Sequence, residues 1–252
     1  MQLMDQTVFV TGAASGIGAA VALRCLAEGA FVGLVDKDAG QLERLIGDLS
    51  PELRAKARSC TTDVANESEV VESLDNFVKS LGRLDAAVNC AGILGPVGPL
   101  HQTATDEYRA LMRVNLDGLF HCMKHQLRHM AATAKGSIVN ISSAAGTVGF
   151  PTAAAYTAAK HGVIGLTRTC AIDYAESGIR VNAIAPGGVD TPLIRATTCA
   201  TPEGKEMIES LHPMKRLASA DEIANAALFL VSDQASFVTG SVMAVDGGWT
   251  TW

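Results

Sequence analysis

The chain has 252 residues, 48% hydrophobic and 18% charged, and its 20 Lys and Arg against 26 Asp and Glu give a formal net charge of -6 at pH 7. This length suits a single large domain, and the apolar content excludes wholesale disorder. An acidic chain lacks the positive field that attracts polyphosphates, so nucleic acid is not an expected partner.

Short apolar runs alternate with amphipathic stretches along the chain. In chain order, the sequence predicts a strand at Thr7–Thr11, a helix at Gly16–Glu28, a strand at Phe31–Asp36, a helix at Gln41–Leu49, a strand at Ala55–Thr61, a helix at Glu67–Leu81, a strand at Leu84–Asn89, a helix from Asp106 to about Ala132, a strand at Gly136–Ile141, a helix at Ala153–Glu176, a strand at Arg180–Ala185, a helix at Asp221–Ser232 and a strand at Ser241–Val245. The strands are apolar on both faces, as in a parallel sheet covered by helices on both sides. We therefore expect one doubly wound α/β domain spanning residues 1–252.

The segment from Gly187 to Met214 breaks this alternation. It contains Thr191-Pro192 and Thr201-Pro202 and has weak periodicity. A loop of this length in a compact domain is usually a lid or a binding loop. We therefore expect a substrate lid at about residues 187–214.

Nothing in the sequence predicts export or a membrane span. The first six residues lack the basic start of a signal peptide, and Tyr156, Lys160 and His161 interrupt the most apolar long window, Ala144–Leu166. The six cysteines are scattered and form no CxxC pair. We expect reduced, mostly buried thiols and a cytoplasmic protein.

A glycine-rich turn, Thr11-Gly12-Ala13-Ala14-Ser15-Gly16-Ile17-Gly18, joins the first predicted strand to the first helix. Glycines let the backbone turn tightly and approach a pyrophosphate closely. The free N–H groups at the start of the helix then hold the phosphates. A plain tight turn is the alternative, because a glycine-rich turn by itself is a weak signal.

The ends of the next strands support a dinucleotide site. Asp36 ends the second strand, where a carboxylate can accept hydrogen bonds from the adenosine ribose and repel a 2′-phosphate, which favours NAD over NADP. Lys37 would soften that repulsion, and an ordinary turn residue is the alternative for Asp36. Asp63-Val64 and Asn89-Cys90-Ala91-Gly92 also follow strands, at the edge where open α/β sheets bind ligands.

A second group of residues predicts proton transfer. Tyr156 and Lys160 lie four residues apart in a predicted helix and share one face. An ammonium at ~4 Å from a phenolate contributes about 4 kcal/mol at an effective dielectric of 20, so we expect a lowered phenol pKa. Ser142-Ser143 ends the fifth strand, and Ser143 is placed to hold a substrate oxygen. A surface Tyr–Lys pair and a serine turn are the alternatives.

Together these motifs resemble the short-chain dehydrogenase/reductase family in its common single-domain form. The matching residues are Thr11-Gly12, Gly16-Ile17-Gly18, Asn89-Cys90-Ala91-Gly92, Asn115, Ser143, Tyr156-Thr157-Ala158-Ala159-Lys160, Pro186-Gly187-Gly188-Val189-Asp190-Thr191 and Asp246-Gly247-Gly248. The resemblance covers nearly the whole chain. It implies a Rossmann fold with a mostly parallel seven-stranded sheet and a homo-oligomer, with a tetramer favoured over a dimer.

The resemblance also implies roles for individual residues. Tyr156 would be the general acid/base, Ser143 would polarise the substrate oxygen, Lys160 would hold the nicotinamide ribose and lower the tyrosine pKa, and Asn115 would fix a relay water. The residues expected at the cofactor are Gly12, Ser15, Gly16, Ile17, Gly18, Asp36, Asp63, Val64, Asn89, Ala91, Gly92, Tyr156, Lys160, Pro186, Gly187, Val189 and Thr191. Cys90 replaces a second asparagine that is common in the family, with little expected effect. The extra glycine in Pro186-Gly187-Gly188 is expected to loosen the start of the lid.

Three histidines, His121, His125 and His129, recur every four residues on one helical stripe. Such a stripe can share a metal ion, but no carboxylate joins it on that helix, so we expect no metal. The resemblance places this helix at a subunit interface instead.

The predicted substrate cleft is mainly apolar. Its expected lining is Ile93–Leu100, Phe150 and the lid, with Arg195 as the single basic residue between Gly187 and Gly204. This favours an apolar, perhaps alicyclic, secondary alcohol or ketone as substrate of an NAD(H)-dependent oxidoreductase. A 3-oxoacyl-carrier-protein reductase is the alternative enzyme, and a non-catalytic dinucleotide-sensing scaffold is the alternative outside enzymes.

Overall fold

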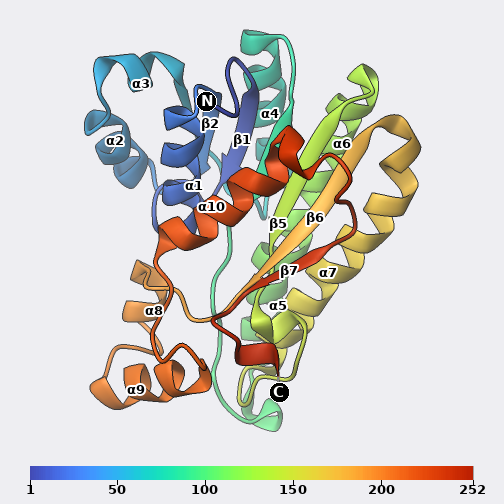
Figure 1. Ribbon diagram of the computed structural model, residues 1–252. Helices are drawn as coiled ribbons and strands as arrows, with labels where there is room; N and C mark the ends of the chain where they lie inside the picture. The colour runs from blue at the N-terminus through green and yellow to red at the C-terminus, as the bar shows by residue number, and fades with distance from the viewer. Residues whose placement is uncertain (252) are drawn as a thin grey trace.

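The computed structural model describes residues 1–251, so the last residue of the predicted domain 1–252 lies outside the described residues (Figure 1). Seven strands form one sheet in the order β3-β2-β1-β4-β5-β6-β7, and every neighbouring pair is parallel. The strands are β1 (Thr7–Thr11), β2 (Phe31–Asp36), β3 (Ala57–Thr61), β4 (Ala86–Asn89), β5 (Gly136–Ile141), β6 (Ile179–Pro186) and β7 (Val242–Val245). The predicted doubly wound seven-stranded sheet is confirmed. Its strand order reverses between β1 and β4, where folds of this kind bind ligands.

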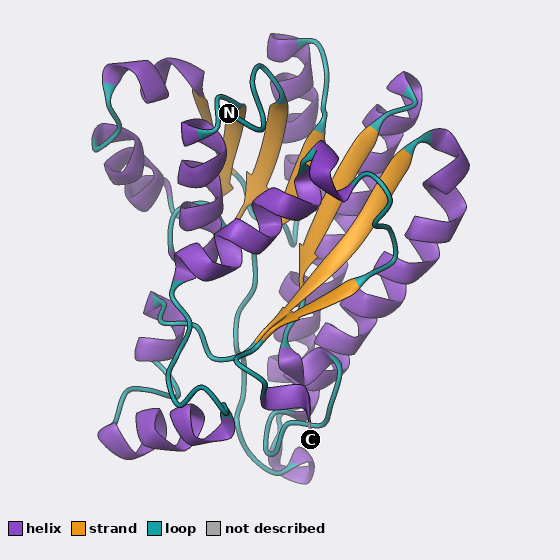
Figure 2. Cartoon of the chain, viewed as in Figure 1, coloured by secondary structure: helices purple, strands orange, loops and turns teal. Residues whose placement is uncertain are grey.

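Helices cover both faces of the sheet (Figure 2). One face carries α1 (Gly16–Ala27), α2 (Ala39–Gly47), α3 (Pro51–Lys56) and α10 (Ala220–Val231), and the other carries α4 (Glu67–Leu81), α6 (Gly118–Thr133) and α7 (Ala154–Tyr174). The short α3 was not predicted; it begins at Pro51 and is capped by Ser50. Alternate residues of a strand point to opposite faces. In β1, Val8 and Val10 accordingly enter one core, while Phe9 enters the other.

The helix predicted from Asp106 to about Ala132 is not uniform. It consists of α5 (Thr105–Met112), the π-helical turn η2 (Arg113–Asp117) and α6. Asn115 lies within the π-helical turn and is buried. Such turns inside α-helices occur frequently at functional sites.

The segment 187–214 was predicted as a long loop, and this was wrong in detail. It contains two helices, α8 (Pro192–Arg195) and α9 (Pro202–Leu211), which lie beyond the carboxyl ends of the strands (Figure 1). Each begins with a Thr-Pro pair: Thr191 Oγ1 accepts a bond from the Ile194 N–H, and Thr201 Oγ1 accepts one from the Gly204 N–H. Proline is well suited to the first helical position, because that residue needs no backbone donor.

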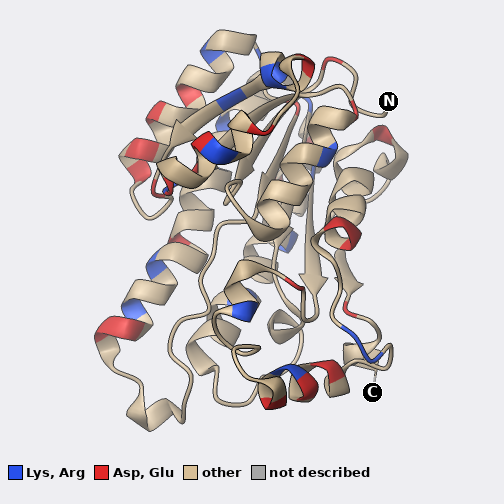
Figure 3. Cartoon of the chain, turned by 90° about the vertical axis from the view of Figure 1, so that its left-hand side faces the viewer, with Lys and Arg blue, Asp and Glu red and all other residues tan. Residues whose placement is uncertain are grey.

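Lys and Arg residues and Asp and Glu residues are both spread over the outer helices, including α9 (Figure 3). This agrees with the small net charge of -6. Among residues 1–251, no helix combines the length and the apolar character needed to cross a membrane.

Candidate functional site

Two adjoining cavities open at the carboxyl edge of the sheet. The first, the glycine-loop cavity, is lined by Gly12, Ser15, Gly16, Ile17, Gly18, Val35, Asp36, Lys37, Asp38, Gln41, Thr62, Asp63, Val64, Cys90, Ala91, Gly92, Ile93, Val114, Thr191, Pro192 and Leu193. The second, the tyrosine cavity, is lined by Ile17, Cys90, Gly92, Ile93, Leu94, Ile141, Ser142, Ser143, Ala145, Phe150, Tyr156, Lys160, Pro186, Gly187, Gly188, Val189, Thr191, Leu193, Ile194, Thr197, Thr198, Ile208 and Trp249. Because the two cavities share residues, one extended ligand can reach from one into the other.

The glycine loop fits a pyrophosphate. Gly12 and Gly16 have φ angles of 67° and 54°, a backbone region that residues other than glycine rarely adopt. A Cβ added to Gly12 would lie 2.8 Å from the Ala91 nitrogen, and one on Gly18 would lie 2.0 Å from the Gly12 oxygen. Ser15, the N-cap of α1, makes no side-chain capping bond. The first N–H groups of α1 are therefore available to an anion, as a bound dinucleotide requires.

Asp36 lies in the glycine-loop cavity with an oriented carboxylate. Its Oδ2 accepts from the Ala14 N–H at 3.0 Å, and its Oδ1 accepts from the Asp38 N–H at 3.1 Å. Asp38 lines the same cavity, and its capping bonds from Gln41 hold its pKa below the usual range. Two carboxylates therefore flank Lys37 here, which makes this end of the cavity unfavourable for a further anion.

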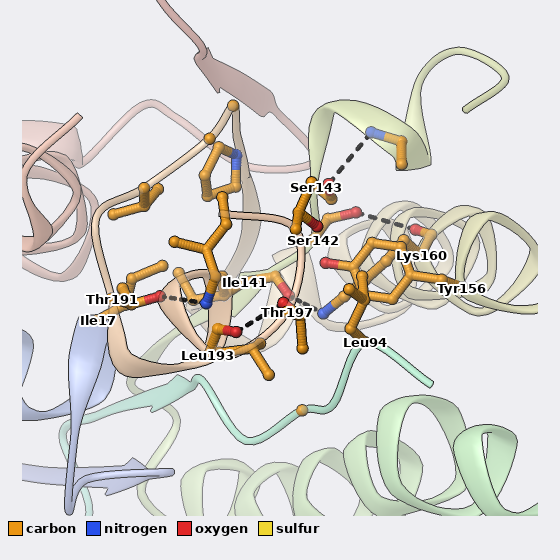
Figure 4. A pocket seen from close by; sticks show the side chains of 18 of the residues that line it. Ile17, Leu94, Ile141, Ser142, Ser143, Tyr156, Lys160, Thr191, Leu193 and Thr197 are labelled. Carbon is orange, nitrogen blue, oxygen red and sulfur yellow. Dashed lines mark hydrogen bonds between the residues drawn. The ribbon is translucent and has the colours of Figure 1, made fainter. Parts of the chain in front are cut away.

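Ser143, Tyr156 and Lys160 meet at the tyrosine cavity (Figure 4). Ser143 follows β5 and caps a 3-10 turn by accepting from the Ala145 N–H, while Tyr156 and Lys160 belong to α7. The Lys160 ammonium lies 5.7 Å from the Tyr156 ring centroid and donates a 2.8 Å hydrogen bond to the Ile141 carbonyl. Ser142 donates instead to the Lys160 carbonyl at 2.9 Å, which ties the end of β5 to α7.

The expected lowering of the Tyr156 pKa is not found in the protein alone. Burial raises the pKa of Tyr156, and hydrogen bonding by Ser143 offsets only part of that rise. Burial also lowers the pKa of Lys160 to about 8. The physical reason is that both groups leave water, while the ammonium is directed at the Ile141 carbonyl rather than at the phenol.

Asn115 acts on the loop after β4. Its Oδ1 accepts from the Ile93 N–H, and its Nδ2 donates to the Ile93 carbonyl, both at 2.8 Å. The amide thus completes the backbone hydrogen bonding of a residue that lines both cavities. The side chain expected to fix a relay water is engaged with Ile93.

Asn89 belongs to a buried polar network rather than to the lining of either cavity. Its side chain exchanges hydrogen bonds with Gln126 and donates to Asn140, which in turn donates to Thr167. The network joins β4 and β5 to α6 and α7. Every other residue expected at the cofactor lines at least one of the two cavities, so Asn89 is the exception.

The glycine pair does not loosen the start of the segment that was predicted as a lid. A Cβ added to Gly188 would lie 2.7 Å from Ile208 Cγ2 and 2.8 Å from Leu217 Cδ2, so this segment is closely packed. A buried residue that the sequence reasoning missed, His212, accepts a hydrogen bond from the Gly188 N–H. Trp249, also missed, lines the tyrosine cavity. Neither belongs to a recognised motif. The glycine pair was the one signal of close packing at this turn, but it was interpreted as loosening the segment.

The histidine stripe on α6 contacts α4 and the segment before it. His121 Nδ1 lies 3.0 Å from the Val64 carbonyl, while His125 and His129 meet Glu67 and Asp75 at 2.9 and 2.7 Å. Lys124 also bonds Glu67, and together these partners lower the Glu67 pKa to about 2. The carboxylates that the stripe lacks on its own helix thus come from α4. Within residues 1–251, no group of three or more ligating side chains is arranged to hold a metal ion.

Comparison with known proteins agrees with this geometry. A family model described as enoyl-(acyl carrier protein) reductase matches residues 12–250. The cis-4-hydroxycyclohexanecarboxylate dehydrogenase of Sinomonas cyclohexanicum is 43% identical over 98% of this chain and 97% of that protein. A 2,5-dichloro-2,5-cyclohexadiene-1,4-diol dehydrogenase of Sphingobium indicum is 40% identical over 98% of both chains. The solved structure of ElxO with NADP bound has a TM-score of 0.93 at 35% identity, covering 99% of this chain and 100% of that one.

The named relatives are dehydrogenases that act on alcohols, and they match this chain from end to end. The fold, the glycine loop and the Ser–Tyr–Lys arrangement point to the same class of oxidoreductase, which uses a nicotinamide dinucleotide. The chain belongs to the short-chain dehydrogenase/reductase family.

Proposed function

We propose that the protein is an NAD(H)-dependent oxidoreductase that interconverts an uncharged alicyclic secondary alcohol and its ketone. The observation that carries the proposal is the tyrosine cavity, where the Ser143 and Tyr156 hydroxyls face a wall made mostly of apolar side chains. Hydroxyl groups in an apolar pocket suit a substrate with one reacting oxygen and a hydrocarbon body. Both named sequence relatives act on alcohols that carry a six-membered carbon ring.

The charge pattern supports an uncharged ring. Lys160 is the one cation among the residues that line the tyrosine cavity. Arg195, the basic residue of the lid, is held by Asp190 through bonds of 2.6 and 2.8 Å and does not line this cavity. A buried carboxylate needs a paired cation, and no arginine lines this cavity to bind a carboxylate of the substrate.

Tyr156 is the proposed general base for alcohol oxidation and general acid for ketone reduction. Ser143 donates a hydrogen bond to the substrate oxygen, and its hydrogen bond with Tyr156 favours the ionised phenol. Lys160, anchored at the Ile141 carbonyl, is proposed to hold the nicotinamide ribose. The bound nicotinamide supplies the hydride acceptor or donor. We assign Asn115 to positioning, because its two side-chain polar atoms hold Ile93 at the edge of both cavities.

The proposed preference for NAD rests on Asp36 and Asp38. Their carboxylates line the glycine-loop cavity on either side of Lys37. A 2′-phosphate placed among them would meet net negative charge. ElxO carries NADP in its solved structure, so overall likeness does not decide between the two cofactors; the local charges are what support the proposal of NAD.

An absorbance assay of NADH formation tests the proposal. The panel contains cyclohexanol, a straight-chain secondary alcohol, cis-4-hydroxycyclohexanecarboxylate and, in the reducing direction, cyclohexanone and an acetoacetyl thioester with NADH or NADPH. We expect cyclohexanol to exceed the carboxylate by about tenfold in kcat/KM. Preference for the thioester with NADPH would indicate the acyl-carrier reductase instead. Tight NADH binding without turnover of any alcohol would indicate a sensor.

We also propose a homotetramer working in the cytoplasm, with a dimer as the alternative assembly. Phe120 on α6 and Ile172 on α7 are exposed apolar side chains on the outer helices, as at a subunit interface. All six cysteines are free thiols, which suits a reducing compartment. Light scattering coupled to size exclusion measures the assembly directly.

A further inference from the structure

His212 is fixed by bonds at both ring nitrogens. Nε2 accepts from the Gly188 N–H at 2.9 Å, so it carries no hydrogen, and Nδ1 lies 2.7 Å from the Ile208 carbonyl, to which it donates. A carbonyl can only accept and a backbone N–H can only donate, so the ring is neutral and has a single tautomer. The residue is 1% exposed.

These two bonds join two parts of the substrate site. Ile208 belongs to the lid helix α9, and its side chain lines the tyrosine cavity. Gly188 belongs to the turn that leads from β6 to Val189 and Thr191, which line the same cavity. The imidazole therefore connects the lid with the turn beneath it through hydrogen bonds that solvent does not reach.

The same ring also supports a cavity wall. His212 packs edge-on against Trp249, with ring centroids 5.3 Å apart, and Trp249 packs in the same way against Phe150 at 5.5 Å. Trp249 and Phe150 both line the tyrosine cavity. Edge-to-face pairs have defined geometry, so the orientation of His212 restricts the orientation of the indole.

The glycine pair of the turn makes room for the ring. A Cβ on Gly187 would lie 2.4 Å from His212 Nε2, and one on Gly188 would lie 3.2 Å from His212 Cε1. Side chains at either position would displace the imidazole. The extra glycine of Pro186-Gly187-Gly188 is thus explained by His212, which lies twenty-four residues further along the chain.

We propose that His212 is a positioning residue that holds the lid helix, the Gly187–Val189 turn and the Trp249 wall in one arrangement, and so sets the affinity for the ring of the substrate. The proposal rests on the proposed function for the nature of the substrate. His212 touches neither Tyr156 nor the glycine loop, so it governs binding of the alcohol rather than the proton transfer.

Three substitutions separate its contacts. His212→Phe keeps an aromatic ring beside Trp249 and removes both hydrogen bonds. His212→Gln keeps an acceptor near the position of Nε2, and His212→Asn keeps a donor near the position of Nδ1. The control is His161→Phe, because the exposed His161 has the same bond to a carbonyl four residues earlier, Thr157, but no contact with the lid.

We expect His212→Phe to raise KM for cyclohexanol about tenfold while kcat changes less than about threefold, since lost binding without lost chemistry appears in KM. His212→Gln should restore KM to near the wild-type value, and His161→Phe should leave it unchanged. A fall in thermal stability with an unchanged KM would overturn the proposal, as would a fall in kcat alone. If His212→Phe does not fold, the comparison of His212→Gln with His212→Asn tests the proposal instead. Equal KM values for these two variants would contradict the positioning role of His212.

A second measurement does not depend on turnover. The chain has 2 tryptophans, so Trp252→Phe leaves Trp249 as the sole indole emitter. In that background, His212→Phe should shift Trp249 emission to longer wavelength, and His212→Gln should not. An unchanged spectrum contradicts the positioning of Trp249. Failure of the proposed function would instead appear as a wild-type protein that turns over no cyclic alcohol, with the spectral shift still present.

Discussion

Lys160 donates its ammonium hydrogen bond to the Ile141 carbonyl at 2.8 Å, while Tyr156, one turn earlier on the same helix, presents its ring 5.7 Å away. The cation is thus anchored to the end of β5, at the same place from which Ser143 projects. In the protein alone, burial keeps the pKa of Tyr156 raised. The phenol becomes an effective base only when the site as a whole stabilises its ionised form.

Replacing Tyr156 with Phe should lower kcat by about 10²–10⁴, because the proton acceptor is lost while the cavity keeps its shape. NADH binding, followed by fluorescence titration, should remain close to that of the wild type. Tyr174→Phe is the control, since it removes a phenol outside both cavities. Retained turnover in Tyr156→Phe would contradict the assigned role.

Replacing Asp36 with Ala should raise the ratio of NADPH to NADH in kcat/KM about tenfold or more, because a 2′-phosphate no longer faces this carboxylate. The comparison variant is Asp38→Asn, which removes the second carboxylate of the proposal while leaving an oxygen to accept the Gln41 N–H bond that caps α2. If the NADPH-to-NADH ratio rises in Asp38→Asn but not in Asp36→Ala, the cofactor preference comes from Asp38, and the role assigned to Asp36 is wrong.

Asn115→Leu should cost about 1–3 kcal/mol in the free energy of unfolding, because both backbone groups of Ile93 lose their partner. It should also reduce kcat/KM, since Ile93 lines both cavities. Asn182→Leu is a matched control: its amide likewise bonds two backbone groups, the Val238 carbonyl and the Ser241 N–H, outside both cavities. Denaturant unfolding and steady-state kinetics of both variants should show equal stability losses but unequal kinetic losses.

Lys160 gives the cofactor-free protein a defined pH dependence. Its pKa falls from 10.5 to about 8 on folding, so between these values the unfolded chain binds more protons than the folded one. Stability therefore rises with pH across this window, and the gain is lost as pH falls toward 8. Relative to Lys160→Met, the wild type should become more stable from pH 8 to 10.5, as measured by denaturant unfolding. The exposed Lys79→Met should follow the wild type, and parallel curves for Lys160→Met and wild type would refute the assignment.

The sequence predicted the central strands of the sheet well, because they are buried on both faces and therefore consist of short apolar runs. Thr7–Thr11, Phe31–Asp36 and Gly136–Ile141 agree with the structure at both ends. The lid was harder. Thr191-Pro192 and Thr201-Pro202 were interpreted as loop signals, although the same pairs start α8 and α9 through a threonine cap followed by proline. The π-helical turn at Arg113–Asp117 has no counterpart in the hydrophobic pattern.

The site shows the same division. Motifs with fixed spacing indicated Tyr156, Lys160 and the glycine loop, because each lies within one local element. His212 and Trp249 could not be found in this way, since their contacts with Gly188 and Phe150 join segments far apart in the sequence. The direction of the Tyr156 pKa also depends on burial, which residue spacing alone does not report.

The sheet order places the two groups of site residues on opposite sides of one sheet. β1 pairs with β2 on one side and with β4 on the other, so Asp36 and Asp63 belong to one wing of the sheet and Ser143 and Tyr156 to the opposite wing. Recombination between family members near Leu84, ahead of β4, would transplant most of one wing intact. The residues proposed to set cofactor choice and those proposed to act on the alcohol would thus lie on opposite sides of a single crossover point.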